Sequence, residues 1–156
     1  MIYGLAVIDQ LLERHQALQK GLKSLEETCL YRFPSQLEEL AEAEKLLKRL
    51  MSFLEESLYS HFAYEEEVLQ PWLDELFVRT LQLDHREIES EINEVKSMAT
   101  RERLQGLSRE RLQFLISYIH GRVVVTYRMV EDHTAKEGVI LRMVRRALQE
   151  KEQKKG

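Results

Sequence analysis

Two copies of one short pattern stand out in the sequence: His61-x-x-x-Glu65 and His133-x-x-x-Glu137. Four residues along an α-helix correspond to about 400° of rotation and about 6 Å of rise, so both members of each pair project from one helix face. An imidazole and a carboxylate in that geometry can bind one divalent or trivalent metal ion together. The two patterns, with two further histidines, therefore suggest a metal pair inside a helical bundle.

The spacing of apolar residues predicts helix over nearly the whole chain. Four runs with apolar residues at intervals of three or four positions are separated by breaks at Phe33-Pro34, at Pro71 and in the segment 97–108. Ser35 and Glu38 form a capping box, which predicts the start of the second helix. Four long helices with short connections predict an all-α, up-down-up-down four-helix bundle.

Six polar residues interrupt these runs at positions where the spacing requires apolar side chains. They are His15 in the first run, His61 and Glu65 in the second, His85 in the third, and His133 and Glu137 in the fourth. Burial of such groups costs several kcal/mol when no partner satisfies them. We therefore expect the six side chains to meet in the bundle centre, with metal as the simplest common partner.

Two of the three predicted turns bring successive histidines to one height in the bundle. These are the turns at Pro71 and within 97–108, which separate His61, His85 and His133. The first turn, at Phe33-Pro34, leaves His15 about 13 Å away from the height of His61, at 1.5 Å of rise per residue. Two alternatives remain open: the first helix continues past Tyr31, or residues 32–37 form a long connection.

The other histidine contacts are interpreted as structural. His85 and Glu89 also have the i, i+4 spacing, but Glu89 lies at the edge of its apolar run, which favours a surface contact. His120 lies beside the fourth run, about 20 Å along the axis from His133, and is interpreted as structural or surface. Cys29 is expected to be a small buried residue near a helix end.

Composition limits the classes of function. The chain has 156 residues, which fits one domain, and a formal charge of −4 with a pI of about 5.8 argues against nucleic acid as a partner. One cysteine allows no intrachain disulfide, and the sequence has neither a convincing signal peptide nor an apolar stretch of ~20 residues. We expect a cytoplasmic protein without membrane contact, with a bundle over 1–148 and a frayed, charged tail over 149–156.

Four segments, taken in order, resemble a known family. They are His15, then His61-Phe62-Ala63-Tyr64-Glu65-Glu66-Glu67-Val68-Leu69-Gln70-Pro71, then Asp84-His85-Arg86-Glu87-Ile88, and finally His133-Thr134-Ala135-Lys136-Glu137. Over nearly the whole chain this set resembles a hemerythrin-like (HHE cation-binding) domain. The resemblance implies a four-helix bundle that holds a non-haem di-iron centre. It also implies that the four histidines are terminal ligands and that Glu65 and Glu137 bridge the two irons.

The sequence departs from the oxygen-carrying hemerythrins at one place. Those proteins have a fifth histidine, four residues from another on the third helix, where this chain has Glu89 in one direction and Leu81 in the other. Leu81 cannot bind a metal, whereas Glu89 offers a carboxylate. Reversible oxygen carriage like that of the respiratory proteins is therefore not implied. Mixed imidazole and carboxylate ligands suit iron, and also manganese or zinc.

Three hypotheses of function follow. The first is a di-iron protein that binds or senses O₂, NO or iron itself, with a small diatomic ligand or peroxide as its partner. The second is a di-iron peroxidase or oxidase that uses open positions on the metals. The third is a metal-free helical module that docks a protein, in which the acidic run Glu65-Glu66-Glu67 and the basic stretch 142–146 are docking patches or solvated faces.

Overall fold

The computed structural model describes residues 2–27 and 40–156 of the chain. Its helices are α1 (Ile2–Leu25), α2 (Leu40–Phe53), the π-helical segment η3 (Leu54–Leu58), α3 (Tyr59–Leu69), α4 (Glu75–Met98), α5 (Arg101–Leu104) and α6 (Arg109–Gln153). Because α2, η3 and α3 follow one another without a break, they form one continuous helix. The described residues contain no strand, and the predicted all-α four-helix bundle is confirmed.

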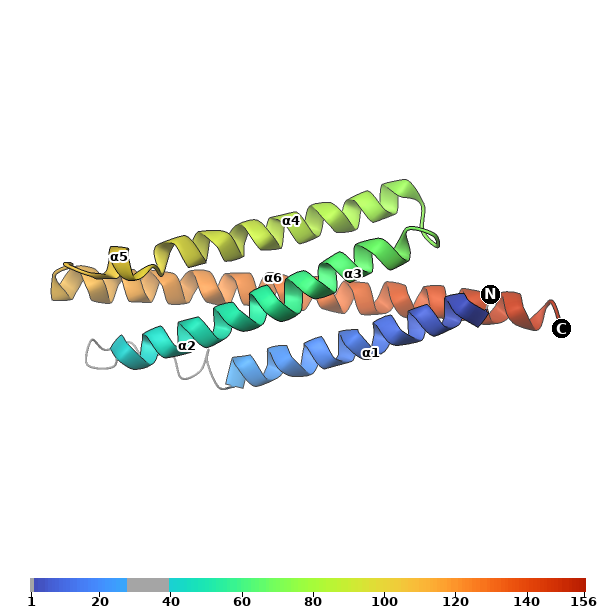
Figure 1. The fold of residues 1–156 in the computed structure, drawn as a ribbon, viewed down its shortest axis with the longest axis horizontal. Helices are drawn as coiled ribbons and strands as arrows, with labels where there is room; N and C mark the ends of the chain where they lie inside the picture. The colour runs from blue at the N-terminus through green and yellow to red at the C-terminus, as the bar shows by residue number, and fades with distance from the viewer. Residues whose placement is uncertain (1, 28–39) are drawn as a thin grey trace.

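The four long helices lie along one common axis and alternate in direction (Figure 1). The connection from α3 to α4 lies at the end that also carries both termini, and the connection from α4 to α6 lies at the opposite end (Figure 1). Helix α6 contacts both α1 and α4, and α3 contacts α4 and α1. This arrangement has the predicted up-down-up-down order.

Two of the predicted breaks are confirmed, and capping side chains define where the next helices begin. Helix α3 ends at Leu69, just before Pro71, and α4 begins after Asp74, whose side chain accepts a hydrogen bond from the backbone N–H of Phe77 at 2.8 Å. Ser108 caps α6 in the same way. The short helix α5 within the segment 97–108 was not predicted.

Several sequence predictions fall on residues that the structure does not describe. The break at Phe33-Pro34, the capping box of Ser35 and Glu38, and the burial of Cys29 all lie outside the described residues. Of the charged tail predicted over 149–156, the part up to Gln153 belongs to α6. Among the described residues, no helix combines the length and the apolar character that a membrane crossing requires.

The buried apolar side chains form two separate clusters along the bundle axis. The large cluster includes Leu18, Phe62, Ile88 and Val130, and the small cluster consists of Ile8, Leu11, Leu69, Leu81 and Leu141. On each long helix the polar core residues lie, in sequence, between members of the two clusters; in α4, for example, His85 lies between Leu81 and Ile88. The polar residues are therefore enclosed by apolar layers on both sides.

The core positions on the second helix follow the prediction except near its end. The predicted run was Leu47, Leu50, Leu54, Leu58, His61, Glu65 and Val68. All of these are buried except Val68, which is half-buried. Phe62 and Leu69, each one residue beyond a predicted position, are buried as well. The π-helical segment η3 lies just before these two residues.

Candidate metal centre

Four of the six predicted residues form a compact buried group. Glu65 comes from α3, His85 from α4, and His133 and Glu137 from α6. One ligand atom of each lies within 4.8 Å of the others, and all four side chains are buried. Nitrogen and carboxylate oxygen atoms at such separations can hold a metal ion between them.

The two carboxylates connect this group to the fifth residue, His61. Nε2 of His61 lies 3.3 Å from Oε1 of Glu137 and 3.8 Å from Oε2 of Glu65. On its other side Glu137 approaches Nε2 of His133 at 2.6 Å, and Glu65 approaches Nε2 of His85 at 3.5 Å. Glu137 therefore lies between His61 and His133, and Glu65 lies between His61 and His85. A ligand that bridges two metals must lie between histidines in this way.

The sixth residue, His15, reaches the centre from α1. Its ring centroid lies 6.1 Å from that of His61, and the side chain is buried. Gly138 makes this approach possible, because a Cβ atom at that position would lie 3.0 Å from Cε1 of His15. The height difference calculated for the first turn is thus absent, and the structure brings all six predicted residues together. Their assignment as metal ligands stays a prediction.

Two carboxylates outside the predicted set orient the histidines. Nδ1 of His85 lies 2.8 Å from Oε1 of Glu66, and Nδ1 of His133 lies 2.9 Å from Oδ2 of Asp84. Each contact leaves Nε2 pointing toward the centre, the arrangement that metal-binding histidines commonly show. The interpretation of Glu66 as part of a solvated or docking face is wrong, because this side chain binds His85.

Phe62 packs directly against the same two histidines. Its ring stacks on His85 with centroids 3.9 Å apart and planes 8° from parallel, and it meets His133 edge-on at 5.5 Å. These contacts limit the rotation of both imidazoles and exclude water from one side of the centre. Phe62 lies one residue beyond His61 and was not among the predicted core positions.

Burial and mutual contacts shift the pKa values of both carboxylates, in opposite directions. Burial and a hydrogen bond with Glu137 raise the pKa of Glu65 to about 9. Burial also acts to raise the pKa of Glu137, but hydrogen bonds to Glu65, His133, His61 and His85 outweigh it and hold that pKa well below its usual range. Two ionised carboxylates in contact would repel each other, so the pair keeps one proton between them.

The histidines respond to the same environment. Burial alone would lower the pKa of His85. Hydrogen bonds to Glu137, Glu65 and Glu66 outweigh that effect and raise the pKa to about 9. The pKa of His133 is raised in the same way: burial lowers it, and contacts with Glu137 and Asp84 more than reverse that. Burial dominates at His15 and lowers its pKa. Without metal, the centre therefore balances its charges with protons.

Protons balance the charge of the centre but leave some of its buried polar atoms without a well-aligned hydrogen bond. These atoms are Nε2 of His15, both carboxylate oxygens of Glu65 and Oε2 of Glu137. Buried polar atoms normally have a partner, and these four belong to one group of nitrogen and oxygen donors. That donor set fits a pair of metal ions, with no thiolate present.

The alternative candidates lie outside the centre. Glu89 pairs with Arg86 at 3.1 Å and is not part of the buried group. The surface contact predicted between His85 and Glu89 is wrong, because Nδ1 of His85 contacts Glu66 instead. Leu81 belongs to the small apolar cluster. His120 is half-buried and lies away from the group, as its interpretation as a structural or surface residue required.

The fold and the buried group together define a helical bundle with the donors of a cation-binding centre. The family model of the hemerythrin HHE cation-binding domain matches residues 6–144. Since this match spans most of the sequence, the chain belongs to that family. The same comparisons give no match to a curated protein and none to a solved structure.

Proposed function

We propose that this protein binds a pair of non-haem iron ions and uses them to bind or sense O₂, NO or iron itself. His85 and His133 serve one metal position and His15 and His61 the other. Glu65 and Glu137 bridge the two positions. Such a set leaves sites on the metals for a small diatomic molecule or peroxide, and an iron pair in these positions supplies reversible redox chemistry.

The single observation that supports this proposal is the position of the two carboxylates. Each lies between His61 and a histidine of the other half, at 2.6 to 3.8 Å. An ionised carboxylate is very costly at a buried position unless charge and hydrogen bonds satisfy it. Two cations that share both carboxylates satisfy every ligand atom at once, whereas one cation leaves His15 without a partner.

The test is anaerobic addition of Fe(II) to the purified protein, followed by metal analysis and by absorption spectra before and after O₂ or NO. We expect about two irons per chain and charge-transfer bands that change with the added gas. The variant Glu137→Gln should lose the second iron, because one bridging carboxylate is gone. A control variant, Glu131→Gln, alters an exposed glutamate of the same helix and should bind two irons. A colourless protein that takes up no iron contradicts the proposal.

The same preparation tests the enzyme hypothesis. Steady-state turnover of peroxide that disappears in His61→Ala but persists in His120→Ala would favour a peroxidase over a binding protein. An iron protein with gas-dependent spectra and no turnover supports binding or sensing.

A further inference from the structure

One of the four histidines in the centre lacks the hydrogen bond that the other three make. His85 contacts Glu66 and His133 contacts Asp84, each through Nδ1, and the ring of His15 is hydrogen-bonded to the backbone of Thr134. The only hydrogen bond of His61 within the described part of the chain is that of Nε2 with Glu137. Metal-binding histidines almost always donate their second N–H, so a partner for Nδ1 of His61 is expected.

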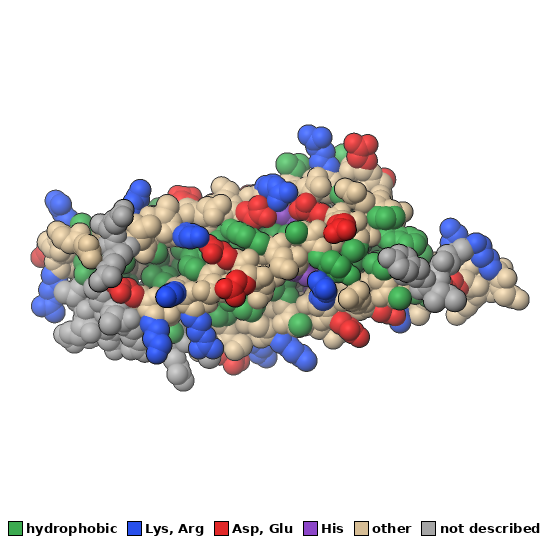
Figure 2. Space-filling model, viewed as in Figure 1, with side chains coloured by type: hydrophobic (Ala, Val, Ile, Leu, Met, Phe, Trp, Pro, Cys, Tyr) green, Lys and Arg blue, Asp and Glu red, His purple; other side chains and the backbone are tan. Residues whose placement is uncertain are grey.

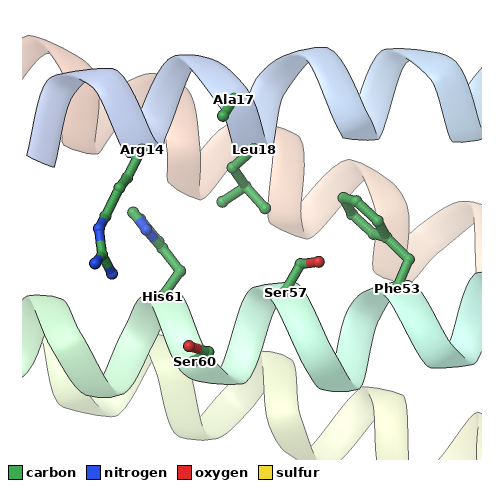
Figure 3. Close-up of a pocket in the computed structure, with 7 residues that line it drawn as sticks. All are labelled: Arg14, Ala17, Leu18, Phe53, Ser57, Ser60 and His61. Carbon is green, nitrogen blue, oxygen red and sulfur yellow. The ribbon is translucent and has the colours of Figure 1, made fainter.

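His61 also lines a cavity. It has a volume of about 250 Å³ and lies between α1 and the continuous helix of α2, η3 and α3. Figure 3 shows its seven lining residues: Arg14, Ala17 and Leu18 from α1, and Phe53, Ser57, Ser60 and His61 from the facing helix. Its volume far exceeds the roughly 30 Å³ that one water molecule occupies in the liquid, so it can admit a small organic molecule.

Arg14 gives this cavity a cation that can bind an oxyanion. It has no carboxylate partner among the described residues, and its guanidinium lies over the ring of Tyr64, 3.8 Å from the centroid. Figure 3 shows the Arg14 side chain extending toward His61, with Ser57 on the other side of the His61 ring. A guanidinium binds a carboxylate through charge-assisted hydrogen bonds.

The other side of the cavity is apolar and fixed in place. It is formed by Ala17, Leu18 and Phe53. The Phe53 ring fits closely against the backbone of α1, since a Cβ on Gly21 would lie 2.6 Å from two of its atoms. An inorganic anion gains nothing from this apolar wall, whereas a ligand with a short hydrocarbon chain buries that chain against it.

We propose that this cavity binds a small organic carboxylate. Its carboxylate group is held by Arg14 and accepts the Nδ1 hydrogen of His61. Its hydrocarbon part lies against Leu18 and Phe53. The cavity itself depends only on these residues, whereas the link to the metal pair rests on the proposed function.

The link follows from the hydrogen positions on His61. Without metal, Nε2 faces Oε1 of Glu137 at 3.3 Å. A carboxylate oxygen in that position accepts the Nε2 hydrogen, so Nδ1 is left as the acceptor atom of the ring, which repels an anion. A metal bound at Nε2 takes that position and places the hydrogen on Nδ1. Metal loading thereby creates the hydrogen-bond donor that the carboxylate of the bound ligand needs. By reciprocity, binding of that ligand in the cavity strengthens metal binding.

Calorimetric titration at fixed ionic strength tests the proposal with acetate, propionate, butyrate and inorganic phosphate as probes. Each probe is titrated into the metal-free and the zinc-loaded protein, and zinc content is measured separately. We expect affinity to rise from acetate to butyrate, phosphate to bind more weakly than butyrate, and zinc to strengthen butyrate binding. In the zinc form, butyrate should also shift the ¹⁵N resonance of Nδ1 of His61.

Two substitutions on α1 separate the cavity from general charge effects. Arg14→Gln should weaken butyrate binding about tenfold, because it removes a charge-assisted contact. Lys20→Gln removes the same charge from an exposed position on the same helix and should leave binding unchanged. Circular dichroism verifies that both variants fold.

The outcomes distinguish the two levels of the argument. Absence of saturable carboxylate binding, equal effects of the two α1 variants, or phosphate binding as tight as that of butyrate overturns the cavity assignment. Equal butyrate affinity in both forms of a protein that does hold zinc overturns the link through His61. Failure to take up metal counts against the proposed function alone, since binding of butyrate that depends on Arg14 is still measurable in the metal-free protein.

Discussion

Metal binding should expel protons from the centre, and their number can be calculated from the structure. The pKa of Glu65, raised to about 9 by burial and by its contact with Glu137, keeps one proton on this carboxylate pair at neutral pH. The pKa of His85 is also about 9, because its hydrogen bonds to Glu137, Glu65 and Glu66 outweigh the effect of burial. A metal ion requires both groups without their protons. Loading at pH 7 should therefore release two protons from Glu65 and His85, plus whatever His133 still holds.

The size of the effect follows from the distance between pH 7 and a pKa of about 9. Each group is unprotonated in only about one molecule in a hundred, so removal of each proton costs about 3 kcal/mol at pH 7. With two protons released, the apparent metal affinity should rise about 100-fold per pH unit up to the pKa. Above that pH, the gain should level off.

Zinc is the suitable probe because it has no redox chemistry. Calorimetry in buffers with different ionisation enthalpies gives the number of protons released, and competition with a chelator at pH 7 and pH 8 gives the change in affinity. Glu65→Gln should release one proton fewer. Glu67→Gln, at an exposed position two residues further along, should release the same number as the unchanged protein. Release of less than one proton, or an affinity independent of pH, would refute the calculated protonation of the centre.

Three further predictions concern the same centre. The metal-free protein should become less stable as pH rises from 7 to 9. Glu65 and His85 hold their protons up to about pH 9 in the folded protein but lose them near their ordinary pKa values in the unfolded chain. Thermal melts at several pH values measure this loss of stability, which the metal-loaded protein should not show. Asp84→Asn and Glu66→Gln should each weaken zinc binding about 10- to 100-fold in chelator competition, whereas Glu87→Gln, an exposed neighbour, should not. Gly138→Ala should reduce the metal content from two equivalents to one, because its Cβ would lie 3.0 Å from Cε1 of His15. In the control Gly121→Ala nothing lies within 4 Å of the added Cβ, so this variant should keep both metals. Denaturant unfolding should show that Gly121→Ala stabilises the protein by about 1 kcal/mol.

Periodicity was sufficient to predict the bundle and to bring the six polar residues together. A helix that buries one face requires apolar residues at intervals of three and four, so a histidine or glutamate at such a position is informative by itself. All six residues are indeed buried. What periodicity cannot provide is the rotation of one helix against another, and this rotation decides which residues beside the apolar stripe reach the centre. Glu66 and Asp84 were missed for that reason.

The second helix shows a different limit of sequence reasoning. Phe62 and Leu69 are buried beside the expected positions, and Val68, expected in the core, is only half-buried. Intervals of three and four do not distinguish between two adjacent apolar residues such as Val68 and Leu69. The adjacency of Asp84 to His85, and of Glu66 to Glu65, is the one signal that pointed to the orienting carboxylates, because both lie beside predicted ligands.

The two halves of the centre differ in a way that bears on how it works. His85 and His133 are each oriented by a carboxylate and are covered by Phe62, so their positions are set before any metal arrives. An anionic partner also makes an imidazole a stronger ligand. His15 has only a backbone partner. Nδ1 of His61 has no hydrogen-bond partner among the described residues, and His61 borders the cavity. The half with His85 and His133 should therefore hold its metal tightly, while the other half adapts to what enters. This difference explains why Gly138→Ala, which among the six residues of the centre crowds His15, is expected to remove one metal equivalent and not two.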